Sequence, residues 1–289
     1  MPAMPLSPLP RTMLEPMIRR ALDEDLGLAG DVTSAAVIPP DRRSEVVACA
    51  RQPGRVAGLD CVELTCALVD PAITVTRRVK DGDPIASGTE IATFEGPSRS
   101  LLIAERTALN FLGHLSGIAS VTADLVRRVE GTRAAIACTR KTTPGLRTLE
   151  KYAVRAGGGM NHRYSLSDAM LIKDNHIAIA GGVVPALTRA KQTVGHMVKI
   201  EIEVDTLAQL EQVLEIGADA VLLDNMTPAT LRDAVAMIDG TAIAEASGGI
   251  TPDSVRTVAE TGVDLISMGW ITHSSPCLDI GLDVVAKQK

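Results

Sequence analysis

Three features are scarce in this chain of 289 residues: aromatic side chains, long apolar runs and clusters of basic residues. Aromatic residues make up 2% of the sequence, so few side chains are available for stacking on nucleic-acid bases. No apolar run reaches the roughly 18 residues that a membrane-spanning helix needs. The net charge is −6, whereas a surface that binds nucleic acid is positive. The sequence therefore argues against nucleic-acid binding and against a membrane protein.

Paired cysteines are also missing. The five cysteines are odd in number and none stands in a CxxC pair, which argues against a disulfide framework and against a zinc knuckle. The N-terminal segment lacks the basic stretch followed by an apolar stretch that marks a secretory signal. With 46% hydrophobic and 22% charged residues, the chain is expected to be a cytoplasmic protein with one large and one smaller domain.

The charge that is present is unevenly distributed. Between Thr139 and His176, seven lysines and arginines stand against three acids, which gives this segment a net charge of +4 inside an acidic chain. Three consecutive glycines at 157–159 interrupt it. A local excess of cations is typical of a site for small polyanions. The alternative is a solvated helix face, to which Lys151 and Arg155 are assigned.

The last third of the chain repeats a β/α unit. Four short apolar segments have the length of buried strands: residues 198–204, 219–224, 241–246 and 263–268. Helical segments fill the gaps, with threonine at the expected N-caps, proline at the first helical position and glycine as the stop. These residues are Thr206, Thr227, Thr251, Pro228, Pro252, Gly217, Gly240 and Gly262.

Two further strands are predicted at residues 134–138 and 168–173, which gives at least six parallel strands. No GxGxxG turn opens a helix in this region, so the pattern does not favour a doubly wound sheet. The predicted fold class is α/β, with an open or incomplete α/β barrel in the C-terminal part.

The N-terminal part follows a different pattern. Three segments alternate or run apolar between turns, at residues 44–50, 73–79 and 90–96. They predict an N-terminal α+β sandwich domain of residues 1–115, followed by the barrel domain of residues 116–270. The tail of residues 271–289 is too short for a domain and is expected to pack back on the N-terminal domain.

A helical pattern extends from Leu101 to about Glu130, and Gly113 and Gly117 lie on one face of it. Because glycine has no side chain, this face allows another stretch of backbone to approach closely. We place the junction between the two domains near these glycines.

In a β/α barrel, functional side chains follow the carboxyl ends of the strands. The predicted strand ends are polar in this chain. They contain Thr139–Lys141, Lys173–His176, Glu201, Glu203, Asp205, Asp224, Asn225, Glu245–Gly249 and Ser267–Trp270. The last two loops are rich in glycine, and exposed backbone N–H groups in such loops commonly bind a phosphate.

The alternation of side chains within EIEVD puts Glu201, Glu203 and Asp205 on one face of a strand. A buried carboxylate without a partner is costly. An inward Glu203 therefore requires a cation, which Lys141, Lys173 or a bound metal ion could supply. A salt bridge with a purely structural role is the alternative, but the convergence of lysines, carboxylates and arginines favours a functional site.

Several segments together carry a resemblance to one family: residues 105–120, 139–177, 201–209, 222–225 and 245–250. The most specific part is the ordered set TRKTTPGLR, GGGMNHR and LIKDNH. The sequence resembles the quinolinate phosphoribosyltransferases, also called nicotinate-nucleotide pyrophosphorylases (carboxylating), over nearly its whole length.

The resemblance implies conversion of quinolinate and phosphoribosyl pyrophosphate into nicotinate mononucleotide, pyrophosphate and carbon dioxide, with Mg²⁺, in the de novo synthesis of NAD. It also implies an N-terminal α/β sandwich with an open α/β barrel, assembled as a homodimer or a larger oligomer. Both substrates are polyanions, and the cationic segment suits them.

The resemblance also assigns roles to residues. The quinolinate carboxylates are expected at Arg140, His162 and Arg163, with Arg106 donated by the partner subunit. Lys141 and Lys173 are expected on the pyrophosphate side and at the reacting centre, where a compact charge suits developing charge.

The remaining assignments concern the sugar phosphate. Glu203 and Asp224 are expected to bind the ribose hydroxyls and Mg²⁺, and to stabilise positive charge at the anomeric carbon. With Lys141 and Lys173 they form the expected catalytic set. The other expected substrate-binding residues, mostly for the 5′-phosphate, are Thr139, Ser247, Gly248, Gly249, Met268, Gly269 and Trp270.

Three other functions are compatible with parts of the pattern. A Schiff-base aldolase would use Lys141 or Lys173 as its nucleophile. A phosphosugar sensor would keep the binding site without turnover. A paralogous phosphoribosyltransferase would act on another pyridine acid or a related anion.

Overall fold

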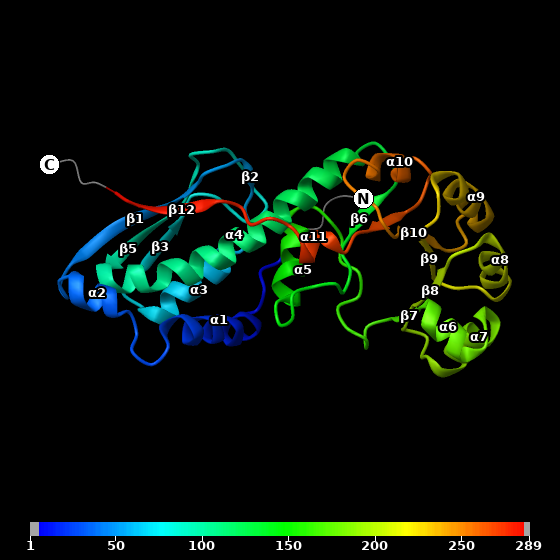
Figure 1. Cartoon of the computed structure of the whole chain (residues 1–289), viewed down its shortest axis with the longest axis horizontal. Helices are drawn as coiled ribbons and strands as arrows, with labels where there is room; N and C mark the ends of the chain where they lie inside the picture. The colour runs from blue at the N-terminus through cyan, green and yellow to red at the C-terminus, as the bar shows by residue number, and fades with distance from the viewer. Residues whose placement is uncertain (1–5, 286–289) are drawn as a thin grey trace. The chain divides into compact units, whose positions relative to one another are not determined.

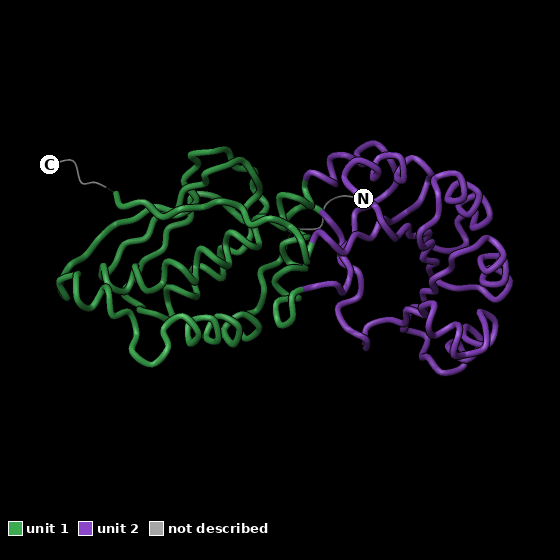
Figure 2. Tube along the Cα trace, in the orientation of Figure 1, with its two compact units in different colours: residues 1–123, 143–158, 272–289 green, residues 124–142, 159–271 purple. Residues whose placement is uncertain are grey.

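The computed structural model describes residues 6–285. These residues form two compact units, coloured separately in Figure 2. Unit 1 contains residues 6–123, 143–158 and 272–285. Unit 2 contains residues 124–142 and 159–271. Residues 143–158 fall inside the range expected for the barrel, but they pack in unit 1.

Unit 1 combines an antiparallel sheet with helices. The sheet has the order β12-β1-β5-β3, and a two-stranded ribbon joins β2 to β4. The strands are β1 (Arg43–Ala50), β2 (Gly54–Arg55), β3 (Thr74–Arg77), β4 (Pro84–Ile85), β5 (Glu90–Pro97) and β12 (Ile280–Val284). The helices are α1 (Arg11–Leu26), α2 (Val32–Val37), α3 (Leu59–Val69), α4 (Ser98–Arg128), which continues into unit 2 after residue 123, and α5 (Arg147–Ala156). The three strands predicted from the sequence correspond to β1, β3 and β5.

The core of unit 1 lies between this sheet and its helices. Val46 of β1, Phe94 of β5, Val62 of α3 and Leu112 of α4 belong to one cluster of buried side chains. The amphipathic α4 is the longest helix among the described residues, and it packs its apolar face into this cluster.

The two glycines of α4 contact the tail of the chain. A Cβ added to Gly117 would lie 2.0 Å from the carbonyl oxygen of Pro276, and one added to Gly113 would lie 3.0 Å from that of Leu278. The backbone N–H of Leu278 donates a hydrogen bond to the carbonyl of Gly113 at 2.9 Å. The close approach of backbone predicted for this helix face is therefore present.

Unit 2 is built on a parallel sheet of the order β6-β11-β10-β9-β8-β7. The strands are β6 (Ala135–Ala137), β7 (Met170–Ile172), β8 (Ile200–Val204), β9 (Ala220–Asp224), β10 (Ile243–Ser247) and β11 (Leu265–Ser267). The helices are α6 (Asp174–Ala180), α7 (Val183–Thr193), α8 (Leu207–Ile216), α9 (Pro228–Ile238), α10 (Val255–Ala259) and α11 (Trp270–His273), the last of which crosses into unit 1.

The sheet of unit 2 curves into a barrel that does not close, because β6 and β7 form its two edges. Figure 1 shows α7, α8, α9 and α10 outside the arc of strands. All six predicted strands are present, although each is shorter than the apolar run that indicated it. The predicted fold class, an open α/β barrel with an N-terminal α+β part, is confirmed.

Threonine caps begin two of the helices as predicted. The side-chain oxygens of Thr206 and Thr227 each accept a hydrogen bond at 3.2 Å from the N–H three residues further on. The expectation for Thr251 is wrong, since α10 begins only at Val255. The Thr251 hydroxyl instead accepts from the N–H of Ser254 at 3.3 Å and closes a turn that precedes the helix.

Within residues 6–285, no helix has both the length and the apolar character that crossing a membrane requires.

Candidate active site

The expected site residues gather at one edge of unit 2. All six strands are parallel, so their carboxyl ends lie at the same edge of the sheet. With the exception of Arg106, every expected site residue lies within four residues of such an end or in the segment that pairs beside β6. The segment is residues 160–163, in which Met160 forms a parallel bridge to Ala137.

Arg106 lies on α4 in unit 1, and its side chain is 64% exposed. Its guanidinium is 3.9 Å from the Glu105 carboxylate, a distance at which an exposed ion pair contributes little. Arg106 is not brought together with the other expected residues within one unit, and its donation to a partner subunit stays a prediction.

The loops after the first and last barrel strands meet. A Cβ added to Gly269 would lie 2.7 Å from Cδ of Lys141 and 3.3 Å from Oγ1 of Thr139. The Lys141 N–H donates a hydrogen bond to that hydroxyl oxygen at 3.0 Å. A glycine at 269 therefore leaves the space that the Lys141 stem occupies, and Lys141 itself stays exposed at the strand ends.

Lys173 supplies the cation that a buried Glu203 requires. Its Nζ donates to Oε2 of Glu203 at 2.6 Å, and Glu203 is 7% exposed. Lys173 is one of the partners that the sequence left open for Glu203. The lysine side chain is 49% exposed, so the ion pair lies at the boundary between the barrel interior and solvent.

Asp224 adds a second carboxylate next to this pair. Burial raises the pKa of the Asp224 carboxyl, and the negative charges of Glu203 and Asp205 raise it further. The positive charges of Lys173 and Lys141 oppose the shift. These five groups are thus near enough to influence one another, and the cluster would be stabilised by one more cation.

The loop after β10 takes a conformation that requires glycine. Gly248 has φ +91°, and a Cβ there would lie 2.2 Å from Oδ1 of Asn225. Gly249 has φ +58°, and nothing lies within 4 Å of its Cβ position. The Asn225 N–H donates to the carbonyl of Ser247 at 3.0 Å, which ties this loop to the end of β9.

The loop after β11 is partly used by the fold. The N–H of Met268 donates to the carbonyl of Ala137 at 3.0 Å, and the Met268 side chain is 2% exposed. Trp270 donates its indole N–H to the carbonyl of Ile250 at 3.3 Å. The Trp270 ring is therefore held against the loop that follows β10.

Arg140 and Arg163 lie near enough for their charges to influence each other. Within residues 6–285, the buried Nε atoms of Arg140 and Arg163 have no hydrogen-bond partner. Burial lowers the pKa of the Arg163 guanidinium, and the positive charge of Arg140 lowers it further. A pair of cations with unused N–H donors is suited to an anion with more than one acceptor group.

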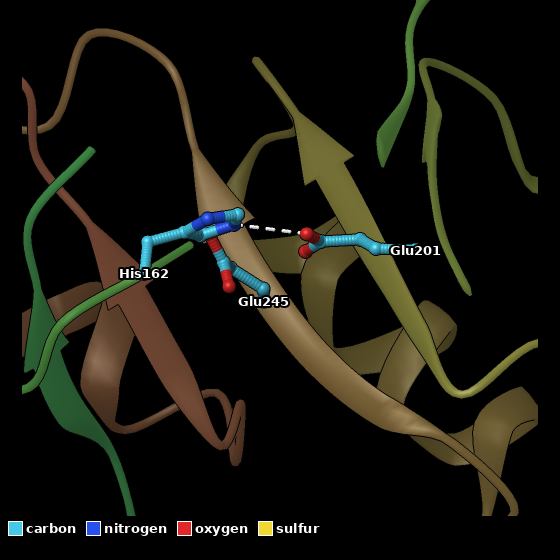
Figure 3. Close-up of side chains that lie close together, drawn as sticks. All are labelled: His162, Glu201 and Glu245. Carbon is cyan, nitrogen blue, oxygen red and sulfur yellow. Dashed lines mark hydrogen bonds and ion pairs between the residues drawn. The ribbon is translucent and has the colours of Figure 1, made fainter. Parts of the chain in front are cut away.

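A buried cluster that the sequence did not single out lies behind His162 (Figure 3). His162 Nε2 is 2.9 Å from Oε2 of Glu201 and 3.7 Å from Oε1 of Glu245. Glu201 comes from β8 and Glu245 from β10, and both are less than 10% exposed. Both acids lie near predicted strand ends. Each stands two residues before an expected site residue, Glu203 or Ser247, so the alternation of side chains places it on the same face of the strand.

Burial raises the pKa of Glu245 to about 7, and the negative charge of Glu201 adds to the shift. The folded state therefore holds a proton between about pH 4.5 and pH 7 that the unfolded state has lost, and stability falls as the pH rises through this window. We expect Glu245→Gln to match the wild type near pH 4.5. At pH 8 it should be more stable by something on the order of 3 kcal/mol.

Thermal or urea unfolding at the two pH values measures this difference. Glu211→Gln on the exposed face of α8 is the matched control, and we expect it to change stability little at either pH. A Glu245→Gln protein that is less stable than the wild type at pH 8 would show that the buried carboxyl is ionised and favourably paired.

The strand ends of this open α/β barrel carry arginines, lysines, carboxylates and glycine-rich loops. This combination is typical of an enzyme that brings anionic substrates together. The C-terminal domain model of quinolinate phosphoribosyl transferase matches residues 118–283. The N-terminal domain model of the same enzyme matches residues 31–116. The chain belongs to the quinolinate phosphoribosyl transferase family.

Named relatives cover nearly the full chain. A protein of Bacillus subtilis (strain 168), named probable nicotinate-nucleotide pyrophosphorylase (carboxylating), is 42% identical over 271 residues, which are 94% of this chain and 93% of the relative. The nicotinate-nucleotide pyrophosphorylase (carboxylating) of Mycobacterium leprae (strain TN) is 44% identical over 272 residues, 92% of this chain and 95% of the relative.

The solved structure of the nicotinate-nucleotide pyrophosphorylase from Francisella tularensis has a TM-score of 0.93 and 36% sequence identity. The match covers 98% of this chain and 99% of that one. The family resemblance read from the sequence is confirmed.

Proposed function

We propose that this chain transfers the phosphoribosyl group of phosphoribosyl pyrophosphate to quinolinate, with loss of a carboxylate. The products are nicotinate mononucleotide, pyrophosphate and carbon dioxide, in the de novo synthesis of NAD. The observation that supports the proposal most is the pair of arginines, Arg140 and Arg163, with unused Nε donors. Their mutual repulsion is relieved by a ligand with two adjacent negative groups, and quinolinate is such a ligand.

The guanidinium groups are assigned to the quinolinate carboxylates, because a planar fork of donors fits a carboxylate in a bidentate way. Lys141 and Lys173 are assigned to the pyrophosphate side and to the reacting centre. As pyrophosphate leaves, negative charge builds on its oxygens, and an ammonium group at the barrel mouth stabilises it.

Glu203 and Asp224 are assigned to the ribose hydroxyls and to the positive charge that develops at the anomeric carbon. The same two carboxylates fit Mg²⁺, because carboxylate oxygens are its preferred protein ligands. Burial is the main cause of the raised pKa of Asp224, and the nearby negative charges of Glu203 and Asp205, which add to it, also favour a bound cation. Bound Mg²⁺ would neutralise charge on the pyrophosphate, mainly through substrate oxygens and water.

The 5′-phosphate is assigned to the two glycine-rich loops. Gly249 presents an open backbone position, and Gly248 and Ser247 precede it at the end of β10. Gly269 and Trp270 belong to the second loop, which follows β11. Exposed backbone N–H groups in such loops bind a phosphate without the help of a side chain. Thr139 completes the set through its contact with Lys141.

Decarboxylation follows from the substrate's own chemistry. Once the ring nitrogen carries the ribose, its positive charge stabilises the electron pair left on the ring carbon when the neighbouring carboxylate leaves as carbon dioxide. A proton from water then adds to that carbon and completes nicotinate mononucleotide. The protein's contribution is to hold that carboxylate away from water against the arginine pair.

Assembly as a homodimer in the cytoplasm, with Arg106 donated across the interface, belongs to the proposal. Mixing two inactive variants tests it, Arg106→Ala and Lys141→Ala. If Arg106 acts on the partner's site, each mixed dimer regains one intact site, and reassociated dimers should recover about a quarter of wild-type activity. If Arg106 acts on its own subunit, every site in the mixture keeps one defect and no activity returns.

Incubation with quinolinate, phosphoribosyl pyrophosphate and Mg²⁺ tests the function, with pyrophosphate and carbon dioxide followed together. We expect both products in equal amounts, and no carbon dioxide when nicotinate replaces quinolinate. Equal turnover of nicotinate would favour a paralogous transferase. Binding of both substrates without products would favour a sensor, and a covalent adduct after borohydride trapping of a carbonyl substrate would favour an aldolase.

A further inference from the structure

Both ring nitrogens of His162 are engaged by protein groups. Nδ1 accepts a hydrogen bond from the backbone N–H of Arg163 at 2.8 Å. Nε2 lies 2.9 Å from Oε2 of Glu201 on β8, a contact marked by the dashed line in Figure 3. The His162 side chain is 13% exposed. In this arrangement neither nitrogen is directed at a substrate in solution.

The two contacts fix the tautomer of the ring. A backbone N–H can only donate, so Nδ1 must carry a lone pair. The neutral ring then has its proton on Nε2 and donates it to the Glu201 carboxylate. The assignment follows from the hydrogen-bond network, in which the wrong tautomer would leave two N–H donors facing each other at Nδ1.

We propose that His162 is a positioning residue for Arg163, and that Glu201 and Glu245 select its ring tautomer from inside the barrel. The proposal rests on the proposed function, in which Arg163 binds a quinolinate carboxylate. His162 then acts through Arg163 without contacting quinolinate itself. The two buried acids support substrate binding indirectly, through the orientation of the His162 ring.

Arg163 needs such support because its segment has no regular structure. Residues 161–163 lie outside any helix or strand, so no ladder of backbone bonds holds them. The His162 ring fixes the N–H of Arg163, and the Nη1 atom of Arg163 donates to the carbonyl of Ala169 at 2.9 Å. The residue is thereby held at its backbone and at its guanidinium, which leaves the Nε donor in a defined direction.

The same three side chains could be taken for a metal site. One ligand atom from each of His162, Glu201 and Glu245 lies within 4.8 Å of the others. A metal ion at Nε2 would require the lone pair there and would move the ring proton to Nδ1. That proton would then face the N–H of Arg163, so the geometry favours the hydrogen-bonded cluster.

The first test reads the tautomer directly. The full-length enzyme is labelled with ¹⁵N-histidine, and the His162 signals are identified by their loss in His162→Asn. We expect the Nε2-protonated neutral form in the wild type and a smaller share of it in Glu201→Leu, where the N–H of Arg163 still disfavours a proton on Nδ1 but Nε2 has lost its acceptor. Glu201→Gln should keep the wild-type form, since its amide oxygen can still accept from Nε2. A ring protonated on Nδ1 in the wild type, alone or in addition to Nε2, overturns the proposal.

The second test separates the two sides of the ring by kinetics. In His162→Asn, the side-chain oxygen can take the place of Nδ1 and accept from the N–H of Arg163. In His162→Gln, the side-chain amide takes the place of Nε2 and donates to Glu201. We expect His162→Ala and His162→Gln to raise the KM for quinolinate roughly tenfold, the effect of about one hydrogen bond. His162→Asn should stay near the wild-type KM, and the KM for phosphoribosyl pyrophosphate should not change in any of the three.

A His162→Asn protein as impaired as His162→Ala would mean that the ring touches the substrate, which overturns the positioning role. Binding of one Zn²⁺ or Mn²⁺ that is lost in Glu201→Leu would overturn it in favour of a metal site. The NMR result does not depend on turnover. A chain that shows the expected tautomer but does not convert quinolinate therefore contradicts the proposed function and leaves the tautomer assignment standing.

Discussion

Replacement of Lys141 by alanine is expected to lower turnover by at least about a hundredfold while the fold survives. The lysine stands exposed at the strand ends beside Gly269, where pyrophosphate is proposed to leave. Its removal takes away a cation that meets charge developing in the transition state. Steady-state rates of pyrophosphate release, with circular dichroism as a check of folding, measure the effect.

Lys199→Ala is the matched control. Lys199 precedes β8 at the amino end of the strand, away from the carboxyl ends, and its partner there is Asp219. We expect wild-type turnover from this variant, because an exposed ion pair contributes little to stability and none of it to catalysis. Near wild-type turnover by Lys141→Ala would remove that residue from the mechanism.

Gly117→Ala is expected to destabilise unit 1 by about 2–3 kcal/mol. At an ordinary helix position the same change would stabilise the protein by up to about 1 kcal/mol. Here the added Cβ would lie 2.0 Å from the carbonyl oxygen and 3.0 Å from the carbonyl carbon of Pro276. Both are backbone atoms, so the tail or the helix would have to move.

Urea denaturation of the two proteins measures the loss in Gly117→Ala. Gly195→Ala is the control, because nothing lies within 4 Å of its Cβ position and the residue is exposed. A Gly117→Ala protein that equals or exceeds the wild type in stability would show that the tail does not press on α4 in solution.

The barrel could be predicted because its signals are local. A buried parallel strand is a short apolar run, and the N-cap of the following helix stands two or three residues after the strand ends, as Thr206 and Thr227 do. Thr251 has the same local sequence signal, yet its helix begins at Val255. A threonine can close a turn as well as a helix, and only the packing of the following residues decides between them.

The site could be predicted only as a set of strand ends. The sequence required a cation for Glu203, but the choice of Lys173 depends on which strands are neighbours, and β7 lies next to β8. The cluster behind His162 joins β8 to β10, which are two positions apart in the sheet. No local sequence pattern indicates that side chains of two non-adjacent strands will meet. Within the sequence, the presence of acids in buried strands is the signal that they need partners.

The sheet of unit 1 is completed only at the end of translation. Strand β12 pairs with β1 along Val46 to Ala50, and it is translated after the whole barrel. Until then β1 is an edge strand with unpaired N–H and C=O groups. During synthesis the unit therefore carries an exposed sheet edge for the time that unit 2 takes to emerge, and a ribosome stalled before residue 280 would hold a chain prone to pairing with its neighbours.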